Sequence, residues 1–181
     1  MPDVQYTATI DVPRLDVWNF VKDIDNWAPL AKGYQSHESI NNDESIWTVK
    51  GDIGPLSRIT KFQINITEWL EGEGVTFVMK GLNEPINGHG SIRLTDTEDG
   101  GTVIQADAEI QMGGALGPVV NHLIVPWIGA GADELVTNIA QALQPSYEKP
   151  SRPSLVSRLL ASLRRLFGGS DSEPGAGTGD T

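Results

Sequence analysis

The chain of 181 residues contains no cysteine. This absence excludes a disulfide framework, thiolate metal sites and a cysteine nucleophile. The sequence also lacks an apolar run near the roughly 18 residues that a membrane-spanning helix needs. Its first residues show neither the basic flank nor the apolar core of a signal peptide, so we expect a cytoplasmic protein.

Positive charge is scarce and unevenly distributed. The net charge is −11, which argues against nucleic-acid binding because that function needs a basic surface. Residues 1–143 hold 8 basic and 20 acidic residues, whereas residues 149–167 hold five basic residues and no acidic one. This reversal separates an acidic main domain from a basic C-terminal segment.

Motifs for catalysis and metal binding are missing as well. The three histidines lack the spacing of a zinc site, and no serine lies in a nucleophile-elbow motif. We therefore predict no metal site and assign no catalytic residue. An enzyme with this sequence would need polar groups that face its substrate inside a binding cavity. Only Tyr6 and His122 are candidates for that position.

Hydrophobic periodicity predicts an α+β fold. Alternating apolar residues predict strands, and these lie at residues 4–12, 34–40, 45–53, 57–68, 75–80, 86–95 and 102–112. A helix of about 15 residues should begin at Pro13. Residues 115–143 have helical spacing, with Pro126 expected to kink or break the helix. The order predicts a helix-grip fold, in which a curved antiparallel sheet wraps around a long C-terminal helix.

The predicted inner face of the sheet mixes large apolar residues with six glycines and alanines. Glycines can mark bulges, but so many small residues favour an apolar cavity under the helix. Apart from Arg58, this face carries no charge over residues 45–112, which favours ligand binding over catalysis. The predicted lining residues, in which the three glycines provide space, are Trp47, Gly51, Phe62, Ile64, Phe77, Met79, Gly88, Gly90, Met112, Leu123 and Trp127.

Three further segments follow the predicted domain at residues 1–143. Residues 144–153 contain three prolines and indicate a linker, residues 154–167 predict a short helix, and residues 168–181 are expected to be disordered. The short helix combines an apolar face with basic residues, a pattern typical of helices that lie on anionic membranes. Docking on a partner protein or on the chain's own domain are the alternatives. The predicted membrane-binding residues are Leu155, Val156, Arg158, Leu159, Leu160, Leu163, Arg164, Arg165, Leu166 and Phe167.

Four segments together resemble a known family. They are ATIDVP at residues 8–13, GDIGPL at 51–56, GHGSIRL at 88–94 and GGALG at 113–117. On these segments, residues 4–143 resemble the SRPBCC superfamily of START-like helix-grip proteins, and most of all the G subunit of carbon monoxide dehydrogenase. The chain departs from that subfamily at residues 31–33, where AKG stands in place of a usual Pro-Gly.

The resemblance implies binding of a hydrophobic small molecule, a respiratory quinone, between sheet and helix. It also implies exchange of that ligand between the membrane and a partner oxidoreductase. We expect a non-enzymatic carrier of a quinone or other prenyl lipid, peripherally attached to the inner face of the membrane. The implied partner is a molybdenum-dependent oxidoreductase such as carbon monoxide dehydrogenase, and no covalent cofactor is expected. The alternatives are a polyketide cyclase/dehydratase-like enzyme and a ligand-free maturation or adaptor subunit.

Overall fold

A computed structural model describes residues 2–53, 56–115 and 117–146. The predicted helix at residues 154–167 with its membrane-binding residues, the tail at 168–181 and most of the linker lie outside the described residues.

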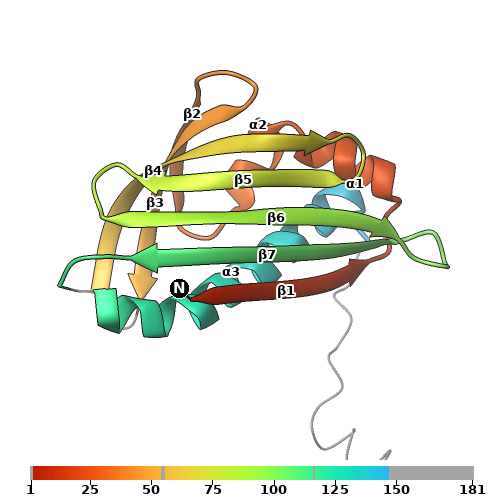
Figure 1. Cartoon of the computed structure of the whole chain (residues 1–181). Helices are drawn as coiled ribbons and strands as arrows, with labels where there is room; N and C mark the ends of the chain where they lie inside the picture. Colours follow the sequence, from red (N-terminus) through yellow and green to blue (C-terminus); the bar gives the residue numbers. More distant parts are fainter. Residues whose placement is uncertain (1, 54–55, 116, 147–181) are drawn as a thin grey trace, which may run out of the picture. The chain divides into compact units, whose positions relative to one another are not determined.

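Seven strands of the described residues form one antiparallel sheet in the order β1-β7-β6-β5-β4-β3-β2 (Figure 1). Each predicted strand is confirmed, because alternation along a strand is a local property that tertiary packing here preserves. The strands are β1 (Asp3–Ile10), β2 (Tyr34–Ser39), β3 (Glu44–Ile53), β4 (Leu56–Leu70), β5 (Gly74–Gly81), β6 (Ile86–Asp96) and β7 (Thr102–Met112).

The predicted continuous helix after Pro13 is wrong. The structure instead has α1 (Arg14–Val21), α2 (Ile24–Trp27) and a 3-10 turn, η1 (Ala28–Leu30). The break lies at Asp23, whose backbone is extended and whose side chain accepts a hydrogen bond from the backbone N–H of Asp25. An aspartate that caps a new helix in this way competes with continuation of the preceding one.

The long C-terminal helix is confirmed as α3 (Gly117–Leu143). It contacts β1, β3 and β7, and Figure 1 shows it running along one face of the sheet. Of the kink or break expected at Pro126, the break does not occur, because the helix continues through this residue. Proline removes the hydrogen bond to the carbonyl of His122, but both residues are exposed, so water can satisfy that carbonyl.

The sheet and α3 pack together through two separate hydrophobic clusters. One contains Trp18 and meets α3 near its C-terminal end at Ala140. The other contains Met112 and meets the N-terminal half of α3 at Val120 and Ile124. The fold is therefore the predicted helix-grip, closed by packed side chains toward both ends of the helix.

Candidate functional site

Two adjoining cavities lie between the sheet and the helices. The larger has a volume of about 940 Å³ and is lined by α1, α2, the β2–β3 turn and the C-terminal half of α3, together with the inner face of the sheet. The smaller has a volume of about 410 Å³ and extends toward the N-terminal half of α3. Nine residues line both, so we describe them as the larger and smaller lobes of one hollow. The shared residues are Tyr6, Trp27, Trp47, Ile64, Phe77, Ile92, Ala106, Ala132 and Leu135.

Most of the residues predicted to line a cavity lie on the walls of this hollow. Those that line the smaller lobe, some of them shared with the larger, are Trp47, Gly51, Phe62, Ile64, Phe77, Met79, Met112 and Trp127. Among the described residues, Leu123 lines neither lobe, in contrast to its sequence-based assignment. Its neighbours Val120, Ile124 and Trp127 line the smaller lobe instead, because successive helical positions are rotated by about 100°.

Gly88 and Gly90 also differ from the prediction, because the described residues that line the lobes do not include them. A Cβ added to Gly88 would lie 3.3 Å from Met79 Cε, and one added to Gly90 would lie 3.0 Å from Phe77 Cζ. These glycines therefore make room for two side chains on the neighbouring strand. Gly51 is different, since a Cβ there would meet only the Trp127 ring, at 3.8 Å, among the described atoms.

An aromatic cluster around Trp47 lies where the two lobes meet. The Trp47 ring is buried, with the Trp27 ring centroid 5.3 Å away and the nearly parallel Phe62 ring at 6.4 Å. Trp27 was not among the predicted lining residues, because it lies in the short α2 rather than on a strand. The sequence feature that could have identified Trp27 is its large aromatic side chain, which stands beside the polar residues that end the first helical segment.

Helix α2 is held against β2 by a chain of polar contacts. The Nε2 atom of His37 lies 2.9 Å from the Asp25 carboxylate, and its Nδ1 atom lies 2.9 Å from the Tyr34 hydroxyl. The His37 ring also packs against Trp47, with centroids 5.7 Å apart. These contacts fix the helix that carries Trp27 and so fix one wall of the hollow.

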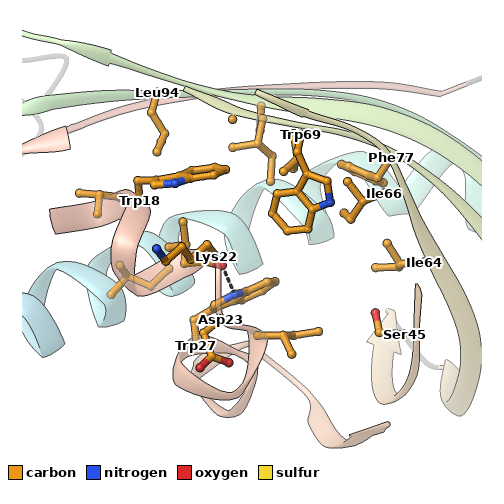
Figure 2. Close-up of a pocket in the computed structure, with 18 of the residues that line it drawn as sticks. Trp18, Lys22, Asp23, Trp27, Ser45, Ile64, Ile66, Trp69, Phe77 and Leu94 are labelled. Atoms are coloured by element: carbon orange, nitrogen blue, oxygen red, sulfur yellow. Dashed lines mark hydrogen bonds between the residues drawn. The ribbon is translucent and has the colours of Figure 1, made fainter. Parts of the chain in front are cut away.

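Trp18 and Trp69 both line the larger lobe. Figure 2 shows the two rings beside each other beneath the sheet, and their centroids are 6.0 Å apart in an edge-to-face arrangement. Trp18 donates its indole N–H to Glu71, at 3.0 Å, and Trp69 donates to Asp43, at 2.7 Å. Because these two carboxylates accept the indole N–H groups, both indoles present apolar surface to the hollow.

The polar groups that the sequence singled out occupy different places. Tyr6 lines both lobes, and its hydroxyl donates to the carboxylate of Asp133 on α3, at 3.3 Å. His122 is exposed and is absent from the described walls of the hollow, which corrects its candidacy as a cavity group.

Two other kinds of feature are absent from the described part of the chain. No group of three or more histidine, aspartate and glutamate side chains there is arranged to hold a metal ion. No described helix combines the length and apolar character needed to cross a membrane.

Solved structures of several proteins share this fold. A conserved protein from Geobacillus kaustophilus is 16% identical, with a TM-score of 0.66 over 81% of this chain and 97% of that one. TTHA0849 from Thermus thermophilus is 12% identical, with a TM-score of 0.62 over 81% of this chain and all of that one. The di-domain ARO/CYC StfQ from the steffimycin biosynthetic pathway is 12% identical, with a TM-score of 0.59 over 80% of this chain and 50% of that one.

At these identities the neighbours establish the fold alone, which is that of SRPBCC-like helix-grip proteins. No curated protein matches the sequence. The family model for the G subunit of carbon monoxide dehydrogenase, CoxG, matches residues 7–144, a segment that contains strands β2 to β7 and α3. The chain therefore belongs to the CoxG family of carbon monoxide dehydrogenase subunits.

Proposed function

We propose that this protein is a non-enzymatic carrier of an apolar small molecule, a quinone or another prenyl lipid. The observation that supports the proposal is the two-lobed hollow between sheet and α3, whose walls are largely aliphatic and aromatic. Pockets for small molecules typically measure roughly 300–1,000 Å³, and each lobe falls within this range. Two adjoining lobes suit a ligand made of a ring and an attached chain.

The hollow also bears on the two alternative functions. A ligand-free adaptor would have its core filled by large side chains, whereas here lobes of about 940 Å³ and 410 Å³ remain between the packed clusters. A cyclase-like enzyme would need polar groups facing its substrate, and the Tyr6–Asp133 pair is the observation that favours it. The carrier explains more of the lining, since the residues around that pair are mostly apolar.

Family membership supports a partner for the carrier. The matching family is described as a subunit of carbon monoxide dehydrogenase, so we propose that the protein serves that oxidoreductase or a related molybdenum-dependent one. The carrier would collect its ligand at the cytoplasmic face of the membrane and exchange it with the enzyme.

Extraction of the purified full chain with organic solvent, followed by mass spectrometry, tests the carrier proposal. We expect close to one prenyl lipid per protein chain. Ala106→Phe should reduce the extracted amount at least about tenfold, because Ala106 lines both lobes and a phenyl ring would fill their junction. The matched control is Ala142→Phe, at an exposed position of α3, which should retain the lipid.

The two variants separate cavity-bound lipid from lipid bound elsewhere on the chain. Equal amounts of lipid from Ala106→Phe and Ala142→Phe would show that the hollow does not hold it. A wild-type protein that yields no lipid and binds no added quinone would contradict the carrier proposal altogether.

We further propose that residues 154–167 attach the carrier to anionic membranes. Deleting them should weaken binding to vesicles containing phosphatidylglycerol by about 100-fold, since each of three arginines near the surface contributes roughly 1 kcal/mol. Sedimentation with vesicles measures the effect, and neutral phosphatidylcholine vesicles serve as the control. Unchanged sedimentation of the deletion variant, with its circular dichroism spectrum retained, would refute membrane attachment by this segment.

A further inference from the structure

Two basic residues, Lys32 and Arg58, belong to the walls of the smaller lobe. Arg58 lies on β4 directly opposite Gly51 of β3. Lys32 precedes Gly33, whose carbonyl accepts a hydrogen bond from the backbone N–H of Lys50, the neighbour of Gly51. The two cations therefore lie on either side of a glycine, which leaves the wall between them without a side chain.

Trp127 of α3 lies across this gap and adds a hydrogen-bond donor. Its Cζ2 atom would lie 3.8 Å from a Cβ added to Gly51, and Cζ2 belongs to the same edge of the indole as the N–H group. Each of the other four tryptophans donates its N–H to a described acceptor. Within the described part of the chain the Trp127 N–H has no such partner, so it is available to a ligand.

The ion pairs of the two cations leave them able to bind a further anion. Arg58 uses Nη1 to contact the Glu84 carboxylate, at 2.8 Å, and a guanidinium carries five N–H donors in all. The Lys32 ammonium lies 3.9 Å from the Glu134 carboxylate, and both side chains are about half exposed. An exposed pair of this kind contributes little free energy, so exchanging its partner costs little.

The larger lobe has the opposite charge. Its described walls contain one basic residue, Lys22, and four acidic residues, which are Asp23, Asp43, Glu44 and Glu71. The smaller lobe has one acidic residue on its described walls, Asp107, whose side chain projects to the other face of β7 because it alternates with Ala106 and Ala108. Repulsion between like charges therefore disfavours an anion in the larger lobe and directs it to the smaller one.

We infer that the gap at Gly51 binds the anionic end of an apolar ligand, a phosphate or a carboxylate, whose chain extends through the hollow toward the larger lobe. Guanidinium, ammonium and indole N–H groups are donors only, and charge-assisted bonds to anionic oxygens are the strongest that they form. The inference rests on the proposed carrier function and specifies the ligand class: among prenyl lipids, those with an anionic end bind more tightly than neutral ones.

Isothermal titration of the full chain with two ligands that share one prenyl chain tests the inference. Geranyl phosphate carries the anionic group, and geraniol carries a neutral hydroxyl in its place. We expect a Kd about tenfold lower for geranyl phosphate, corresponding to one charge-assisted hydrogen bond at a partly exposed site. Inorganic phosphate, which lacks the chain, should bind much more weakly than geranyl phosphate.

Three variants assign the preference to its source. Arg58→Gln should bring the two Kd values close together by weakening only geranyl phosphate. The double variant Arg58→Gln, Glu84→Gln should do the same, which excludes repulsion by an unpaired Glu84 as the cause. The matched control is Lys61→Gln, which removes one positive charge from an exposed position of β4 outside the described walls, and should keep the wild-type preference.

The outcomes separate this inference from the carrier proposal on which it rests. Equal wild-type affinities for the two ligands, or a preference that persists in the double variant, overturn the inference while the carrier proposal stands. Inorganic phosphate that binds as tightly as geranyl phosphate also overturns it, since the site would then hold a free anion. If neither geranyl ligand binds but added decylubiquinone does, the inference alone fails, and if none of the three binds, both fail.

Discussion

Replacing Ile10 by alanine should lower the free energy of unfolding by about 3 kcal/mol. Ile10 has only 1% of its surface exposed and lies in the cluster that joins β1 to Val17 and Trp18 of α1. Removing three carbon atoms there loses their transfer free energy and leaves a void that close-packed neighbours fill only in part. Urea unfolding followed by tryptophan fluorescence measures the change.

Ile59→Ala is the matched control for this prediction. Ile59 lies on β4 with 56% of its surface exposed, so the same substitution should cost at most about 1 kcal/mol, mainly through reduced strand propensity. Similar losses at both positions would contradict the difference in burial between the two side chains.

Gly90→Ala should destabilise the protein by about 2 kcal/mol. The added Cβ would lie 2.5 Å from the backbone oxygen of Asp107 and 3.0 Å from Phe77 Cζ. The oxygen belongs to β7, which is paired with β6, so it cannot move without distorting the sheet. Thermal unfolding monitored by circular dichroism measures the effect as a lower Tm.

Gly129→Ala is the same type of substitution, but it should stabilise the protein. Gly129 lies within α3, and no described atom lies within 4 Å of an added Cβ, outside the excluded neighbours of the helix itself. Alanine should therefore stabilise the helix by about 0.5–1 kcal/mol. If Gly90→Ala instead kept wild-type stability and lost the extracted lipid, the glycine would provide room for the ligand, as the sequence analysis supposed.

The strands and the long helix could be predicted from the sequence because their signals are local. The local spacing of apolar residues indicates which side chains share a face without reference to the rest of the chain. It alternates along residues 45–53 and 102–112 and is helical along 115–143. The same signals placed Trp47, Phe62 and most other predicted lining residues on the walls of the hollow. The short-range competition at Asp23 was overlooked, since apolar spacing continues across the break between α1 and α2.

Whether a small residue on the inner face leaves open space depends on contacts between distant segments. Gly51 and Gly90 have the same chemistry and were both predicted on the inner face, yet Gly51 faces the hollow and Gly90 receives the Phe77 ring from β5. Strand register and side-chain packing decide between these outcomes, and neither can be read from periodicity. The hydrogen bond from Tyr6 to Asp133, 127 residues apart, has the same origin. Local patterns thus determined which side chains share a face of each strand and helix. The docking of α3 on the sheet decided where space remains and which polar group lines that space, because both depend on atoms that only folding brings together.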